Sequence, residues 1–144
     1  MNQNGKVVAA VFILQRNGAC LLQHRDDRPD IRHPGMWTIP GGHRDLHESD
    51  EVCARREVQE ETRYVCKDLH PLYRGDMDDG DGEIYTLCLF WTLYDASQTY
   101  ECLEGQEVKF VMRDQVFNYP ILKFLLPFWD QAITELSRYL HRRA

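Results

Sequence analysis

The run KVVAAVFILQ, from Lys6 to Gln15, constrains the fold more than any other stretch of this sequence. It is apolar and rich in β-branched residues, so it predicts a buried strand. A turn at Asn17-Gly18 follows, and the next segment, Gly18 to Arg25 (GACLLQHR), predicts a second strand. An Asn-Gly pair between two apolar runs is typical of a tight hairpin. We therefore expect a β-hairpin near the start of the chain.

The rest of the chain alternates between strand and helix patterns. The segment from Glu48 to Arg63 lacks Gly and Pro and is rich in Ala, Glu, Arg and Gln, which predicts a helix with Ser49 or Asp50 as its N-cap. Residues from Pro120 onward predict a second helix, with Pro127 kinking it or starting its second half. The remaining expectations are a loop over Asp26–Gly35, a strand, acidic turn and long strand over Leu72–Ala96, and a strand over Glu107–Arg113. This alternation predicts one α/β or α+β domain spanning residues 1–144.

Composition narrows the classes of function. The chain has 144 residues, 43% of them hydrophobic and 28% charged, as in a soluble globular domain. A net charge of -6 disfavours non-specific binding to nucleic acid or to an anionic membrane, and no apolar run is long enough to span a bilayer. Five widely spaced cysteines without a CxxC pair indicate free thiols in a reducing cytoplasm rather than a disulfide framework or a zinc site.

Carboxylates are concentrated on the first predicted helix. Glu57, Glu60 and Glu61 are spaced i, i+3 and i+4, so they project from one side and repel one another. They could form a solvated face neutralised by neighbouring arginines, which is the commoner use of charge runs, or they could bind a hard divalent cation through oxygen. The preceding pair Gly41-Gly42 lets backbone approach a ligand closely and favours the cation. A phosphate–metal site is the hypothesis that unites the two features.

These residues resemble the signature of the Nudix hydrolase family, G-x5-E-x7-R-E-U-x-E-E-x-G-U, where U is bulky and apolar. In this sequence the signature is matched by Gly42, Glu48, Arg56, Glu57, Val58, Glu60, Glu61 and Tyr64. The one departure is Arg63, which stands where the family has glycine. A glycine there would cap the helix in a left-handed conformation, so we expect this helix to run on or to end differently, without loss of activity.

The resemblance implies a fold and a set of roles. The fold is an α/β/α sandwich with a mixed central sheet and a carboxylate-bearing helix. The cofactor is Mg²⁺ or Mn²⁺, held by Glu57, Glu60, Glu61 and the backbone carbonyl of Gly41, with Glu104 of the segment Glu104-Gly105-Gln106 as a further ligand. Arg56 is expected to hold Glu57 by ion pairing, Gly42 and Glu48 to support the motif, and Glu57 to act as general base. A plain turn is the alternative for Glu104.

Two further residues suggest contacts with a small-molecule nucleotide substrate. Arg25 ends the second strand, where related enzymes place a phosphate-contacting arginine, although an ordinary exposed strand end explains it equally well. Asn118, in Phe117–Pro120, resembles the base-reading asparagine of the MutT-like, nucleotide-sanitising branch, and a helix N-cap explains it equally well. We therefore expect cleavage of a nucleoside triphosphate, oxidised or not, to monophosphate and pyrophosphate.

Four other expectations concern the substrate, catalysis, oligomeric state and the acidic stretch. The substrate could instead be a nucleotide sugar or another diphosphate conjugate, with loops at Asp26–His33 and Met77–Gly82 shaping the pocket. A non-catalytic nucleotide sensor is a second alternative, disfavoured because the motif carboxylates are all present. The aromatic content of 11% and the apolar C-terminal helix are compatible with a homodimer and equally with core packing. The acidic stretch Asp76–Glu83 lacks the spacing of a calcium loop and predicts a hairpin turn instead.

Overall fold

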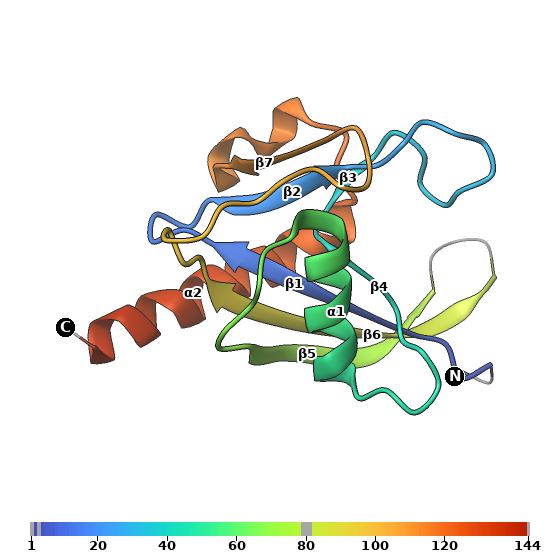
Figure 1. Ribbon diagram of the computed structural model, residues 1–144, viewed down its shortest axis with the longest axis horizontal. Helices are drawn as coiled ribbons and strands as arrows, with labels where there is room; N and C mark the ends of the chain where they lie inside the picture. Colours follow the sequence, from blue (N-terminus) through green and yellow to red (C-terminus); the bar gives the residue numbers. More distant parts are fainter. Residues whose placement is uncertain (1, 3, 79–81, 144) are drawn as a thin grey trace.

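The computed structural model describes residues 2, 4–78 and 82–143, and it shows one mixed sheet between two helices (Figure 1). The strands of this sheet are β1 (Val7–Leu14), β2 (Cys20–His24), β3 (Trp37–Thr38), β4 (Gly41–His43), β5 (His70–Asp78), β6 (Ile84–Leu93) and β7 (Glu107–Val111). The helices are α1 (Asp50–Thr62) and α2 (Leu126–Arg142), with short 3-10 helices η1 (Arg113–Asn118) and η2 (Lys123–Leu125) between β7 and α2. The α/β/α sandwich expected from the sequence is thus confirmed.

Strand β1 lies at the centre of the sheet. It pairs in parallel with β6 and antiparallel with β2 and β4, while β5 extends the sheet beyond β6 and β7 pairs with β2. The predicted hairpin is confirmed, with Gly18 at φ 87° in its turn. Alternate β1 side chains enter two separate cores, one beneath α1 and one beneath α2, which explains why the strand is apolar on both faces.

Helix α1 begins as the sequence predicts and ends differently from the prediction. Ser49 is its N-cap, and its side chain accepts a hydrogen bond from Val52 N. Cys53, Ala54 and Val58 bury one face of α1 against the sheet. At the C-terminus the expectation was wrong, because Arg63 itself adopts the left-handed conformation, at φ 66° and ψ -8°. Its backbone N–H donates a hydrogen bond to Gln59 O. The cap is therefore the glycine-type cap, formed by an arginine.

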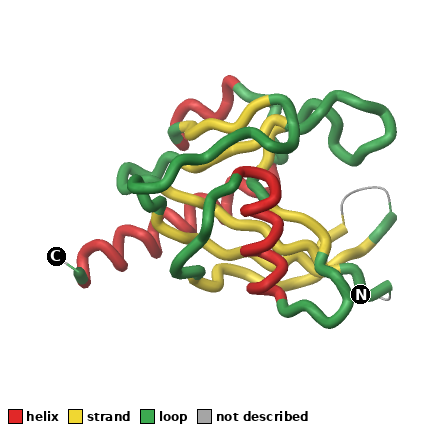
Figure 2. The backbone as a smooth tube through the Cα atoms, viewed as in Figure 1, coloured by secondary structure: helices red, strands yellow, loops and turns green. Residues whose placement is uncertain are grey.

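The C-terminal helix starts later than predicted. Pro120 to Leu122 are extended rather than helical, because their backbone forms hydrogen bonds with Trp37 of β3. Trp37 N donates to Pro120 O at 2.8 Å, and Leu122 N donates to Trp37 O at 3.1 Å. Pro127 then lies in the first turn of α2, where a missing N–H costs nothing. Figure 2 shows that loops join these elements at both ends of the sheet.

Two further predictions concern the acidic turn and membrane-spanning helices. Residues 79–81 of the predicted acidic turn lie outside the described residues, while β5 and β6 flank it as an antiparallel pair. Within the described part of the chain, no helix combines the length and the apolar character needed to cross a bilayer.

Candidate functional site

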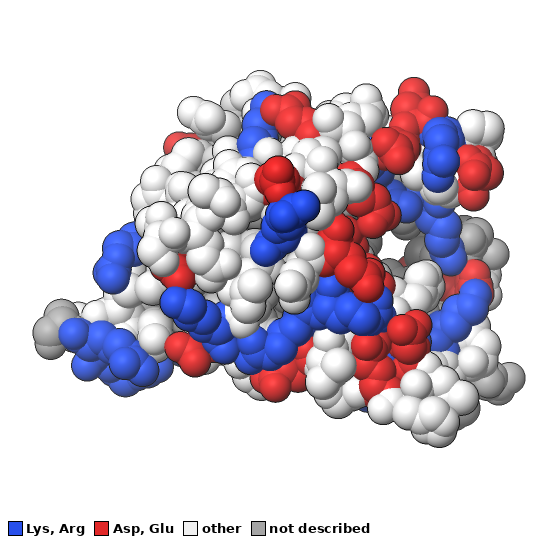
Figure 3. Space-filling view, viewed as in Figure 1, with Lys and Arg blue, Asp and Glu red and all other residues white. Residues whose placement is uncertain are grey.

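A cavity of about 440 Å³ opens beside α1, between the sheet, the loop that links β2 to β3, and the segment leading into α2. Figure 3 shows the surface hollowed beside the acidic side chains of this region. Glu57, Glu61 and Glu104 line one end, and the carboxylates of Asp45 and Glu83 also border the cavity. Apolar and aromatic side chains line the other, chiefly Tyr85, Leu87, Leu89, Leu122 and Phe124. Three cationic side chains, Lys6, Arg25 and Arg32, also line it. The cavity thus offers separate environments for charged and apolar parts of one ligand.

The glycine pair brings the backbone of β4 against both β1 and α1. A Cβ on Gly41 would overlap the carbonyl oxygen of Ala9, and one on Gly42 would lie 2.5 Å from the Glu57 carboxyl group. Neither position therefore accepts a side chain without displacement. The absence of side chains leaves the β4 backbone directly beside the Glu57 carboxylate.

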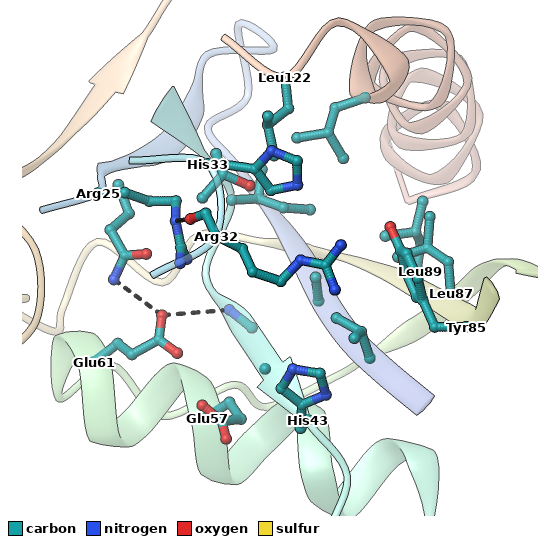
Figure 4. Close-up of a pocket in the computed structure, with 18 of the residues that line it drawn as sticks. Arg25, Arg32, His33, His43, Glu57, Glu61, Tyr85, Leu87, Leu89 and Leu122 are labelled. Carbon is teal, nitrogen blue, oxygen red and sulfur yellow. Dashed lines mark hydrogen bonds between the residues drawn. The ribbon is translucent and has the colours of Figure 1, made fainter. Parts of the chain in front are cut away.

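Glu61 is the most unusual carboxyl group of the cavity, since only 2% of its surface is exposed. It accepts hydrogen bonds from Gln23 Nε2 at 3.1 Å and Gly41 N at 3.4 Å (Figure 4). Burial raises the pKa of Glu61 to about 10, and the neighbouring Glu57 and Glu104 add to the rise. Among the described residues no lysine or arginine forms an ion pair with it. A buried carboxyl group in acidic surroundings is one that a bound cation would stabilise in its ionised form.

Arg56 ties together the motif glutamates on the outer side of α1. Its Nε and Nη2 donate to the two oxygens of Glu48 at 2.6 and 2.9 Å, and its Nη1 donates to Glu57 at 3.0 Å and Glu60 at 3.2 Å. These hydrogen bonds lower the pKa of Glu48 to about 2. Arg56 does not line the cavity, so it contacts Glu57 from outside the cavity.

The structure separates Glu60 from its two neighbours. Glu57 and Glu61 turn into the cavity, whereas the Glu60 side chain is 57% exposed, pairs with Arg56 and does not line the cavity. The helical register explains the difference. Val58 and Ala54 face the sheet, and Glu61 lies one turn further along the same buried face.

The segment carrying Glu104 is fixed from both sides. Leu103 N donates to Glu61 O at 2.9 Å, which couples the segment to the end of α1. On the other side Gln106 N donates to His24 O at 2.7 Å. Gly105 has φ 88°, and a Cβ there would lie 2.5 Å from the same His24 oxygen. Glu104 thereby lines the acidic end of the cavity, within the bend that precedes β7.

The donor groups of the acidic end suit a hard cation. Carboxylate and carbonyl oxygens are the ligands that Mg²⁺ and Mn²⁺ prefer. Within the described residues, no group of three or more histidine, cysteine, aspartate or glutamate side chains is arranged to hold a metal ion. An open set fits Mg²⁺, which takes one or two carboxylates and completes its shell with substrate phosphates and water. Glu57, Glu61, Glu104 and Gly41 all line the cavity, and they are the candidate ligands for such an ion.

The two residues suggested for substrate contacts fall in different places. Arg25 lines the cavity, and its Nε donates to Arg32 O at 2.8 Å. Asn118 is the last residue of η1, is exposed and does not line the cavity. It is not the N-cap of any helix that the structure describes.

Sequence reasoning missed Gln23, which bridges Glu61 and the Glu104 carbonyl from β2. A polar side chain inside the apolar run CLLQH was the signal that could have found it. His43, which lies near Glu57 in Figure 4 and lines the cavity, follows the glycine pair and gave no such signal.

Comparisons with known proteins agree with this geometry. The NUDIX domain family model matches residues 4–129. A MutT NUDIX hydrolase from Burkholderia pseudomallei is similar at 22% identity and TM-score 0.75, over 90% of this chain and 98% of that one. The MutT protein from Methanosarcina mazei Go1 is similar at 18% identity and TM-score 0.76, over 94% and 97%. The NUDIX domain of Shewanella oneidensis NrtR, solved with ADP ribose, is similar at 20% identity and TM-score 0.77, over 93% and 90%. The match of the family model to most of the chain shows that this protein belongs to the NUDIX family, and it is a hydrolase of diphosphate bonds.

Proposed function

We propose that the protein is a metal-dependent pyrophosphohydrolase that cleaves a nucleoside diphosphate linked to another moiety. The division of the cavity carries the proposal, because three carboxylates line one end and an aromatic and aliphatic surface lines the other. A nucleotide has the same division, with an anionic diphosphate joined to a flat, largely apolar base. The five unpaired cysteines support a reducing compartment, and we propose the cytoplasm.

The residues divide the work of such a reaction. A bound Mg²⁺ or Mn²⁺ would neutralise the diphosphate and polarise its phosphorus–oxygen bonds. Glu57, Glu61, Glu104 and the Gly41 carbonyl would hold the ion, with Glu60 a possible ligand only after leaving Arg56. Glu57 is the proposed general base for the attacking water, because it lines the cavity while Arg56 fixes one of its oxygens.

Nucleoside triphosphates are the first proposed substrates, giving the monophosphate and pyrophosphate. Because Asn118 does not line the cavity, Tyr85 and Phe124 are the aromatic side chains available to hold the base. Diphosphate conjugates such as ADP ribose are the second candidate, favoured by the NrtR domain that binds this compound in a similar fold.

Product analysis tests the proposal and separates the two candidates. The purified protein would be incubated with Mg²⁺ and a panel of nucleoside triphosphates, oxidised purine triphosphates, nucleotide sugars and ADP ribose. Pyrophosphate with a nucleoside monophosphate supports the first candidate, and monophosphate with a sugar phosphate supports the second. Nucleotide binding without any product contradicts the enzymatic proposal and favours a sensor.

A further inference from the structure

Arg32 lies in the loop between β2 and β3, a segment that the motif does not include. Figure 4 shows its side chain reaching across the cavity, with Glu57 and Glu61 on one side and Tyr85 on the other. Arg32 also lines the cavity. Its guanidinium therefore occupies the boundary between the acidic end and the apolar end, where the diphosphate of a bound nucleotide must pass.

The direction of this side chain is set by its backbone. Arg25 Nε donates to Arg32 O at 2.8 Å, and the loop is closed by Gly35 N to Asp26 O at 3.0 Å. Arg25 extends from the end of β2, so the sheet itself holds the carbonyl of Arg32. A loop fixed in this way directs the guanidinium towards the cavity, although the side chain stays 38% exposed.

Glu83 is one side-chain partner of Arg32, and this partner can be exchanged. Arg32 Nη1 donates to Glu83 Oε2 at 3.0 Å, and Lys6 forms a second ion pair with Glu83. The side chains of Arg32 and Glu83 are 38% and 33% exposed, so solvent weakens their attraction. A phosphate, which accepts a guanidinium in a forked arrangement, is a stronger partner than this exposed carboxylate.

We propose that Arg32 binds the diphosphate of the substrate, and that Glu83 holds the guanidinium in position while the cavity is empty. Binding exchanges the Arg32–Glu83 ion pair for an arginine–phosphate contact. Glu83 then keeps Lys6 as its partner, so it is not left as an unpaired charge. The inference rests on the proposed function only in requiring a substrate with a diphosphate, and it holds for triphosphates and for conjugates alike.

A set of three variants tests this exchange. Arg32→Ala should raise KM roughly 10- to 100-fold with kcat changed less than threefold, because one charge-assisted contact to the ground state is lost. Arg28→Ala is the matched control, since Arg28 lies in the same loop, pairs with Asp30 and does not line the cavity. It removes the same charge and should leave KM within twofold. Arg32→Lys keeps the charge without the fork and should give an intermediate KM.

The Glu83→Gln variant separates phosphate binding from a purely structural link. If Arg32 only ties the loop to β6 through Glu83, Glu83→Gln should raise KM as much as Arg32→Ala does. If Arg32 binds phosphate, removing its competitor should leave KM unchanged or lower it. An equal rise in Glu83→Gln, an equal rise in Arg28→Ala, or no rise in Arg32→Ala would each overturn the proposal.

Titration with inorganic pyrophosphate and Mg²⁺ provides a readout independent of turnover. Calorimetry should show the Kd for pyrophosphate weakened by a similar factor in Arg32→Ala and not in Arg28→Ala. If the wild-type protein hydrolyses nothing, the proposed function fails, and this titration alone still decides the role of Arg32. If hydrolysis is normal and Arg32→Ala changes neither KM nor the Kd for pyrophosphate, the inference fails and the proposed function stands.

Discussion

The left-handed cap at Arg63 leads to a prediction about stability. A residue with a side chain loses about 1–2 kcal/mol in this conformation, whereas glycine does not. Glycine in turn costs about 0.5–1 kcal/mol through the greater freedom of the unfolded chain. Arg63 also pairs with Glu101 at 2.6 Å, but the two side chains are 70% and 55% exposed, so this pair contributes about 0.2–1 kcal/mol.

Comparing Arg63→Gly with Arg63→Ala isolates the backbone effect. Both variants lose the ion pair with Glu101 and keep the cap N–H to Gln59 O, and they differ only in one methyl group. We expect Arg63→Gly to exceed Arg63→Ala in free energy of unfolding by about 0.5–1 kcal/mol, which is about 1–4 °C in Tm. The free energy of unfolding of the wild type should lie between those of the two variants or close to one of them.

Thermal and urea unfolding of the three proteins would measure this difference. Turnover should be equal in all three within about twofold, because Arg63 does not line the cavity. An alanine variant as stable as the glycine variant, or more stable, would refute the left-handed cap and with it the reading of how α1 ends.

Two further predictions concern the glycine pair and the acid limb of stability. Gly42→Ala should lower kcat roughly 10- to 100-fold with little change in Tm, because the three atoms nearest to its Cβ all belong to the Glu57 carboxyl group. Gly41→Ala places its Cβ against backbone and should cost about 1–3 kcal/mol in unfolding assays. Equal Tm losses in the two would contradict this distinction. Arg56 lowers the pKa of Glu48 from 4.5 to about 2. The contribution of the ionised Glu48 carboxylate to stability is therefore present above about pH 4.5 and is lost as pH falls towards 2. The Tm difference between wild type and Glu48→Gln should therefore be largest at neutral pH and close by about pH 2, and a difference independent of pH would contradict it.

Local patterns predicted most of the fold. The apolar run before Gln15 became β1, the Asn17-Gly18 turn became a hairpin, and Ser49 became the N-cap of α1. Each of these depends on neighbours in sequence. The start of α2 was missed because Trp37, far away in the chain, captures the backbone that precedes the helix.

The site was predictable in its chemistry more than in its arrangement. Motif spacing selected Glu57 and Glu61, which do line the cavity. It did not distinguish Glu60, since the i, i+3, i+4 rule places three residues on one side but does not say which of them the sheet covers. Asn118 lies away from the cavity because the path of the chain after β7 depends on tertiary contacts. Arg32 carries no local signal, because its role depends on a loop folded over the cavity.

The central claim is that the carboxylates at the cavity use a divalent cation to cleave a diphosphate. Its most direct test is the rate of hydrolysis against Mg²⁺ concentration for the wild type, Glu57→Gln and Glu51→Gln. Glu51 lies on the same helix, exposed and outside the cavity, so it controls for the loss of one charge from α1. The account predicts that EDTA abolishes turnover, that Glu57→Gln lowers kcat at least 100-fold, and that Glu51→Gln behaves as wild type. Turnover that persists in EDTA, or an equal loss in both variants, would contradict it.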